Sequence, residues 1–141
     1  MSLHRKCVPF TPLDKDLSKL TVAIVTAAGV HRRDQDPFNI ADELGDLTFR
    51  TIAADATSAD LMVTHHHYDH SDADQDINVV FPLDLLRELK TEGFIGEVAR
   101  EHVGYMGYTM QLRRMYEETA PAIAEFIDKK SKADVIVLTG G

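Results

Sequence analysis

The sequence predicts an α/β domain of three layers, in which a mostly parallel, Rossmann-like sheet is flanked by helices. Two short apolar runs rich in β-branched residues, at positions 22–25 and 135–138, have the composition of strands buried on both faces. Between them, residues 81–93 and 109–130 carry apolar side chains at helical spacing. A length of 141 residues suits one domain with its own hydrophobic core.

The chain divides into an N-terminal arm, residues 1–20, and a single α/β domain, residues 21–141. Pro9 and Pro12 discourage regular structure in the arm. The first strand, 22–25, leads into a polar loop over residues 30–47. A loop of this length in a compact domain is usually functional.

Two further strands are predicted at residues 47–53 and 61–64. Only about seven residues separate them, and a parallel crossover needs a dozen or more. The two strands are therefore either antiparallel or placed apart in the sheet.

The segment 81–93 is the clearest helix. Pro82 suits its first turn, Leu85, Leu86 and Leu89 form an apolar stripe, and Gly93 favours a C-terminal stop. Residues 97–109 fit either a short strand or a loop.

The longer helical pattern over residues 109–130 is interrupted by Pro121. Either the helix kinks there, or a new helix begins with Thr119 as its N-cap.

The last apolar run, 135–138, predicts a buried parallel strand that ends at Gly140 and Gly141. A strand of this kind is normally followed by a covering helix, so we expect the sequence to be the front part of a longer domain, truncated at its C-terminus. The unfinished layer would expose apolar surface, which favours a homo-oligomer.

Composition excludes several classes of function. The formal net charge of −8 and the lack of a basic stripe argue against nucleic-acid binding. No apolar run reaches the length of a membrane span, and the start lacks the apolar core of a secretory signal, so we expect a cytoplasmic protein with no membrane contact. Cys7 is the single cysteine, and it is most simply an incidental thiol on the arm.

The most unusual stretch, THHHYDHSDADQD at residues 64–76, holds four histidines and four aspartates. One interpretation is the HxHxDH metal site of a hydrolase, with His65, His67, Asp69 and His70 as ligands and an open position for water. A calcium loop is rejected, because Ile77 and Leu83 stand where glycine and glutamate are needed. The third interpretation is a structural loop that caps the following helix.

Several segments together resemble the selenoprotein B family of glycine, betaine, sarcosine and D-proline reductases. They occur in the order TAAGVH, DPFN, LGDLTFRTIA, HHHYDHSDADQDINVVFPLDLLREL, VGYMGYT and ADVIVLTGG. The most distinctive part is residues 67–74, continued by Asp76, Ile77 and Asn78 and then by Phe81 and Pro82. The resemblance covers essentially the whole chain.

This resemblance implies an oxidoreductase subunit that takes part in dithiol-dependent reductive cleavage of an amino acid or N-methylated amino acid. The chain itself then carries no cofactor. A selenocysteine or cysteine is expected just after Gly141, and a partner subunit is expected to carry a pyruvoyl group that holds the substrate amine. The 141-residue form is expected to be redox-inactive alone.

The resemblance also directs attention to particular side chains. His67, Asp69 and His70 are the candidate acid–base residues. The substrate-pocket candidates are His31, Asp72, Asp74, Tyr105 and Met106. Two alternatives stay open: a metal-dependent hydrolase that uses the HxHxDH cluster, and a non-catalytic binding subunit of the same fold.

Overall fold

The computed structural model describes residues 11–141, so Cys7 and the first half of the predicted arm lie outside the described residues. The strands are β1 (Thr21–Thr26), β2 (Val30–Arg32), β3 (Phe49–Ala53), β4 (Leu61–Val63), β5 (Glu97–Val98), β6 (Glu101–Tyr105) and β7 (Val135–Thr139). The α-helices are α1 (Ser71–Gln75), α2 (Leu83–Thr91), α3 (Leu112–Arg114) and α4 (Ala120–Phe126). Short 3-10 helices are η1 (Leu17–Lys19), η2 (Ser58–Asp60) and η3 (Ile77–Val79), and π-helical turns are η4 (Met115–Thr119) and η5 (Ile127–Ser131).

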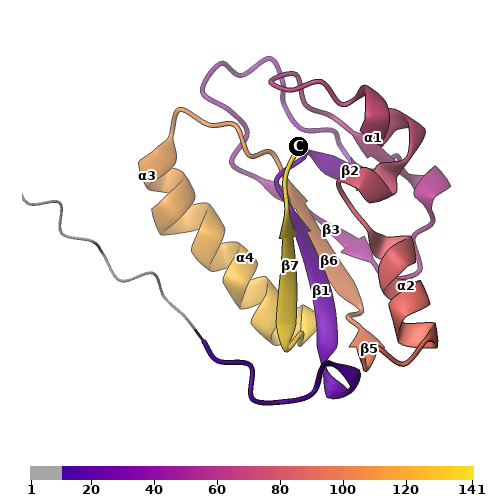
Figure 1. Ribbon diagram of the computed structural model, residues 1–141. Helices are drawn as coiled ribbons and strands as arrows, with labels where there is room; N and C mark the ends of the chain where they lie inside the picture. Colours follow the sequence, from indigo (N-terminus) through magenta and orange to yellow (C-terminus); the bar gives the residue numbers. More distant parts are fainter. Residues whose placement is uncertain (1–10) are drawn as a thin grey trace, which may run out of the picture.

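Strand β1 is the centre of the main sheet (Figure 1). It pairs in parallel with β7 on one side and with β5 and β6 on the other. Strand β3 joins the far side of β6 in the antiparallel sense, and β2 and β4 form a separate antiparallel pair. The predicted mixed α/β class is confirmed, but the antiparallel edge and the second small sheet do not make a plain Rossmann-like arrangement.

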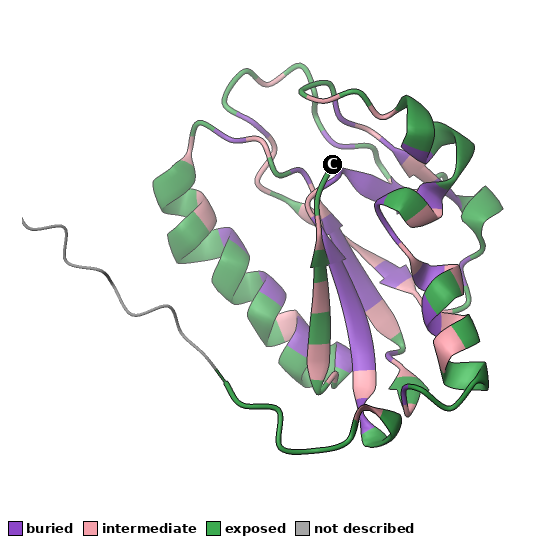
Figure 2. Cartoon of the chain, in the orientation of Figure 1, coloured by how far each residue is buried: buried purple, intermediate pink, exposed green. Residues whose placement is uncertain are grey.

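Successive residues of β1 point into two different cores. Val22 and Ile24 belong to a cluster that includes Leu83 and Leu86 of α2. Ala23 and Val25 belong to a second cluster, which includes Ile123 of α4. Because side chains alternate across a strand, β1 is buried on both faces as predicted, and helices pack against each face (Figure 2).

Helix α2 confirms the predicted helix, with one correction to its apolar face. Leu83 and Leu86 are buried and Leu89 packs beside them, whereas Leu85 is 49% exposed. Pro82 precedes the helix as its N-cap residue, and Gly93 follows in a left-handed conformation with φ 74°.

Residues 112–131 form one continuous helix, made of α3, η4, α4 and η5 in turn. Pro121 stands inside it, as the second residue of α4 after the π-helical turn η4. Of the two alternatives for Pro121, a new helix capped by Thr119 is excluded, because Thr119 has helical dihedrals and its hydroxyl donates to the Leu47 carbonyl oxygen at 2.8 Å.

The remaining strands resolve the open alternatives. The predicted strands 47–53 and 61–64 correspond to β3 and β4, which lie in different sheets. Residues 97–109 contain β5 and β6, and the predicted loop 30–47 begins with β2. The prediction that the last strand is buried is wrong: β7 is an edge strand whose residues alternate between half-buried and exposed.

Over the described residues, no helix has both the length and the apolar character that crossing a membrane requires.

Candidate functional site

The carboxyl ends of β1, β6 and β7 meet at one edge of the main sheet. The Ala27 N–H donates to the Thr139 carbonyl at 2.9 Å, and the Ala27 carbonyl accepts from the Gly107 N–H at 2.8 Å. Ligands of open α/β sheets bind beyond this end of the strands. The stretch of residues 64–76, here called the histidine-rich loop, and the segment that follows β6 both lie here.

Gly29 allows the histidine-rich loop to approach β1 closely. A Cβ atom at this position would lie 2.5 Å from the Thr64 carbonyl oxygen, and the residue has φ 75°, which favours glycine. The Thr64 N–H donates to the Gly29 carbonyl at 2.9 Å, which fixes the start of the loop.

Tyr68 holds the middle of the loop on the ends of the strands. Its hydroxyl donates to the Ala28 carbonyl at 2.9 Å. Its ring packs so closely on Gly141 that a Cβ atom there would lie 2.3 Å from the ring carbon Cζ. Burial raises the pKa of Tyr68, so its hydroxyl keeps its proton at neutral pH. Sequence analysis missed this residue, although its place between His67 and Asp69 was a signal.

His65 is buried beneath the loop. Its Nδ1 accepts the His67 N–H at 3.1 Å, which leaves the imidazole proton on Nε2. Burial, helped by neighbouring His67, lowers the pKa of His65 and favours the neutral ring. His65 therefore acts as a support for the loop.

His67 is exposed and lies flat on Tyr108, with ring centroids 3.3 Å apart and an interplanar angle of 18°. This stack joins the histidine-rich loop to the loop that follows β6. A shallow pocket of about 500 Å³ opens beside it, lined by Ile40, Glu43, Leu44, His66, His67, Tyr108 and Met110.

Asp69 and His70 stand at the start of α1. The Asp69 carboxylate accepts the Ser71 N–H at 3.0 Å, and this hydrogen bond lowers the pKa of Asp69. His70 Nδ1 lies 2.9 Å from the Asp74 carboxylate, one helical turn along the chain. The carboxylate fixes the orientation of the ring through Nδ1, and Nε2 makes no hydrogen bond to a described residue.

The hydrolase interpretation needs His65, His67, Asp69 and His70 to converge on one point. Among residues 11–141, no group of three or more histidine, cysteine, aspartate or glutamate side chains is placed to hold a metal ion. Instead, His65, Asp69 and His70 each make a separate hydrogen bond within the loop.

The predicted substrate-pocket residues do not form one surface. His31 is 1% exposed, and its ring nitrogens lie 2.7 Å from the Arg32 carbonyl and 2.7 Å from the Thr64 hydroxyl. Met106 is fully buried, and Tyr105 packs against the core that contains Val25. Asp72 is exposed on α1, and Asp74 is bonded to His70.

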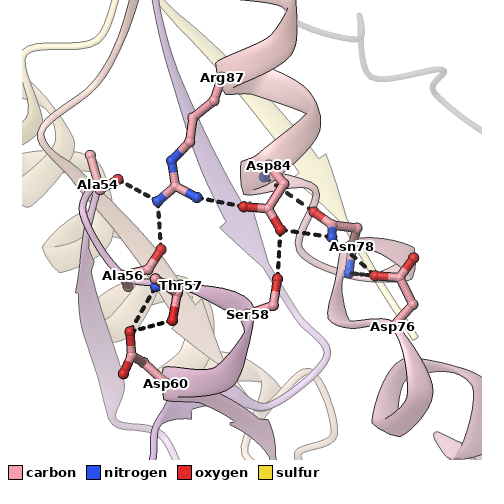
Figure 3. A network of polar contacts seen from close by, with 9 residues as sticks. All are labelled: Ala54, Ala56, Thr57, Ser58, Asp60, Asp76, Asn78, Asp84 and Arg87. Atoms are coloured by element: carbon pink, nitrogen blue, oxygen red, sulfur yellow. Dashed lines mark hydrogen bonds and ion pairs between the residues drawn. The ribbon is translucent and has the colours of Figure 1, made fainter.

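The stretch of residues 64–84, which carries the most distinctive part of the family resemblance, is here called the family motif. Its second half is structural (Figure 3). Asp76 accepts from the Asn78 N–H and side-chain amide, each at 3.0 Å, and Asn78 in turn accepts the Asp84 N–H at 3.1 Å. Asp84 pairs with Arg87, whose guanidinium also donates to the carbonyls of Ala54 and Ala56. These contacts tie the start of α2 to the segment after β3, and so fix where the histidine-rich loop returns to the fold.

Sequence comparison finds related proteins over nearly the whole chain. Residues 2–140 match the sequence model of a family described as "Glycine/sarcosine/betaine reductase selenoprotein B (GRDB)". D-proline reductase subunit gamma of Acetoanaerobium sticklandii is 44% identical over 132 residues, which is 94% of this chain and 53% of that protein.

Two other relatives are less similar. Glycine reductase complex component B subunit gamma of Carboxydothermus hydrogenoformans is 33% identical over 94% of this chain and 30% of its own length. Sarcosine reductase complex component B subunit beta of Peptoclostridium acidaminophilum is 37% identical over 71% of this chain and 23% of its own length. The chain thus spans about half the length of the first relative and less than a third of the other two. No solved structure matches it significantly.

Proposed function

The chain belongs to the glycine/sarcosine/betaine reductase selenoprotein B family, and from this premise we propose that it forms part of a complex that reductively cleaves an amino acid or N-methylated amino acid. The relatives described above are all named as reductase subunits, and two are named as parts of a component B. The chain therefore works with partner reductase subunits on a small amino-acid-like substrate.

A D-proline-type substrate is supported best. The D-proline reductase relative is 44% identical, against 37% and 33% for the sarcosine and glycine reductase relatives described above. This chain also covers a larger share of that relative than of the other two.

Cleavage of the bond between the α-carbon and nitrogen consumes two electrons and two protons. The nitrogen takes one proton as it leaves, the α-carbon takes the other, and a dithiol that supplies the electrons becomes a disulfide. The task for this chain is to deliver a proton at neutral pH, which histidine does well.

His70 is the proposed proton donor, and its pairing with Asp74 is the observation that carries this assignment. Asp74 orients the ring through Nδ1, while Nε2 makes no hydrogen bond to a described residue. The other two candidates suit the task less. His67 lies against Tyr108, and the hydrogen bond from Ser71 lowers the pKa of Asp69, so that Asp69 stays ionised at neutral pH.

Tyr68 is proposed to position this proton donor beside the redox residue. Its ring lies edge-on to His70, with centroids 5.7 Å apart, and packs on Gly141. The family resemblance assigns a selenocysteine or cysteine to the position after a strand like β7, and a pyruvoyl group to a partner subunit. When bound, that pyruvoyl group would hold the substrate amine.

The proposal is tested with the reductase complex of the source organism. D-proline, glycine, sarcosine and betaine are each incubated with dithiothreitol, and the products are identified by mass spectrometry. We expect the complex that contains this chain to convert D-proline, and the isolated 141-residue protein to convert none of the four.

Two results would contradict different parts of the proposal. Unchanged D-proline reduction by a complex depleted of this chain would show that the chain has no role in the reaction. Conversion of glycine, sarcosine or betaine in place of D-proline would overturn the substrate assignment and leave the reductase role standing.

A further inference from the structure

Strand β7 has an open edge. Within the described part of the chain it pairs with β1 alone. The Thr139 carbonyl accepts from Ala27, directly after β1, so the alternation of a parallel ladder directs the backbone N–H and C=O groups of Ile136 and Leu138 away from β1. At the opposite side of the sheet, by contrast, the Gln35 side chain donates to the Thr51 carbonyl of β3 at 2.8 Å.

The side chains of Ile136 and Leu138 form an uncovered apolar surface. They lie in register with Ala23 and Val25, and so share the face of the sheet on which α4 packs. Ile136 is 41% exposed and Leu138 is 76% exposed, and Figure 2 shows β7 with no element in front of it.

The helix over residues 112–131 adds two exposed apolar side chains to this surface. Leu112 is 72% exposed and Tyr116 is 80% exposed, and their spacing of four residues puts them on one flank of the helix. Arg114 and Glu118 each follow one of these two residues by two positions, and they line a pocket beside Phe49 of β3. Leu112 and Tyr116 therefore lie on the opposite flank, toward β7.

We infer that a β-strand and a helix cover the surface formed by Leu112, Tyr116, Ile136 and Leu138, here called the β7 surface. Both elements come from the part of the polypeptide that the longer relatives contain and that these 141 residues do not span. The strand extends the sheet at the open edge of β7, and the helix covers Ile136 and Leu138 alongside Tyr116. The family has enough polypeptide for this, because the chain covers only 53% of D-proline reductase subunit gamma.

A second copy of the chain fits the β7 surface less well. A stable dimer buries about 800 Å² per partner, which is more than these four partly exposed side chains supply. Each copy also carries a net charge of −8, which opposes the association of two copies.

Hydrogen exchange tests this inference without any measurement of activity. In the 141-residue protein, we expect the amides of Ile136 and Leu138 to exchange at least about tenfold faster than that of Val137, which points toward β1. In full-length D-proline reductase subunit gamma, we expect the amides aligned with all three residues to be protected. Fast exchange at the positions aligned with Ile136 and Leu138 in that longer protein would overturn the inference.

Leu138→Lys provides an independent measurement. In the 141-residue protein, where Leu138 is exposed, we expect the melting temperature to stay within about 2 °C of wild type. The same substitution at the aligned position of the longer relative should lower its melting temperature by several degrees. As a control, the substitution of lysine at the position aligned with Leu85, on α2, should leave the melting temperature of the longer relative unchanged. Equal effects in the two proteins, or protection of Ile136 and Leu138 that rises with the concentration of the chain alone, would contradict the inference.

Discussion

At the scale of single residues, His102 shows how a buried histidine serves the fold. It is fully buried on β6, and its Nδ1 accepts the Ile24 N–H of β1 at 3.0 Å. Its Nε2 has no hydrogen-bond partner among the described residues, and the ring lies edge-on to Phe81. The imidazole thus replaces a backbone acceptor at the break between β5 and β6.

The titration of His102 predicts a loss of stability in acid. Burial, with a smaller effect of Arg87, lowers the pKa of His102 from 6.5 to about 4. The unfolded chain then binds a proton at a higher pH than the folded one, so the free energy of unfolding falls as pH decreases from 6.5 to 4. This group alone contributes at most roughly 3 kcal/mol to that fall.

Urea denaturation between pH 4 and 7 checks this expectation. His102→Asn keeps an acceptor for the Ile24 N–H but does not titrate, so its free energy of unfolding should depend less steeply on pH. His66→Asn, at an exposed position in the histidine-rich loop, should keep the wild-type slope. Equal slopes for wild type and His102→Asn would contradict the assignment.

Sequence reasoning at this scale pointed to one loop but could not distinguish the roles of its members. His65, His67, Asp69 and His70 look equivalent in the sequence, yet one is buried, one is stacked on Tyr108, one accepts a backbone N–H and one pairs with Asp74. These differences depend on contacts across the fold, such as that of Tyr68 with Ala28, which spacing along the chain does not reveal.

At the scale of elements, the close crossing of β6 and β2 depends on Gly104. A Cβ atom at Gly104 would lie 1.9 Å from the Val30 carbonyl oxygen, so any side chain there must push β2 away. The sequence predicted either a short strand or a loop over residues 97–109, but could not show that a second sheet crosses it at Gly104.

Gly104→Ala is therefore expected to destabilise the protein by about 2 kcal/mol or more, because the backbone must shift to relieve the overlap. Gly140→Ala is the matched control, since no atom lies within 4 Å of the Cβ position there. Thermal melting should show a drop of several degrees for the first variant and little change for the second. A Gly104→Ala protein as stable as wild type would show that β2 can move freely.

Strands and helices with a local apolar pattern were predicted, whereas their places in the sheets were not. The apolar runs of β1 and β7 and most of the stripe of α2 were visible in the sequence. The sequence left two arrangements open for β3 and β4 and wrongly predicted that β7 is buried, because strand neighbours are set by the whole sheet.

At the scale of the whole molecule, the family motif serves two purposes. Its first half, residues 64–74, lies at the carboxyl ends of β1, β6 and β7, where the candidate site is. Its second half, through Asp76, Asn78 and Asp84, anchors that loop to α2. The order of these segments along the chain allowed the family to be identified. The different roles of the two halves of the motif can be recognised only in the folded structure.

The central claim is that His70, held by Asp74, delivers a proton in a reductase complex that contains this chain. The direct measurement is kcat for D-proline in the complex with His70→Asn, alongside Gln75→Ala as the control at an exposed position of the same loop. We expect kcat to fall about a hundredfold or more for His70→Asn, with complex assembly intact, and to stay near wild type for Gln75→Ala. Unchanged kcat for His70→Asn in an assembled complex would contradict it.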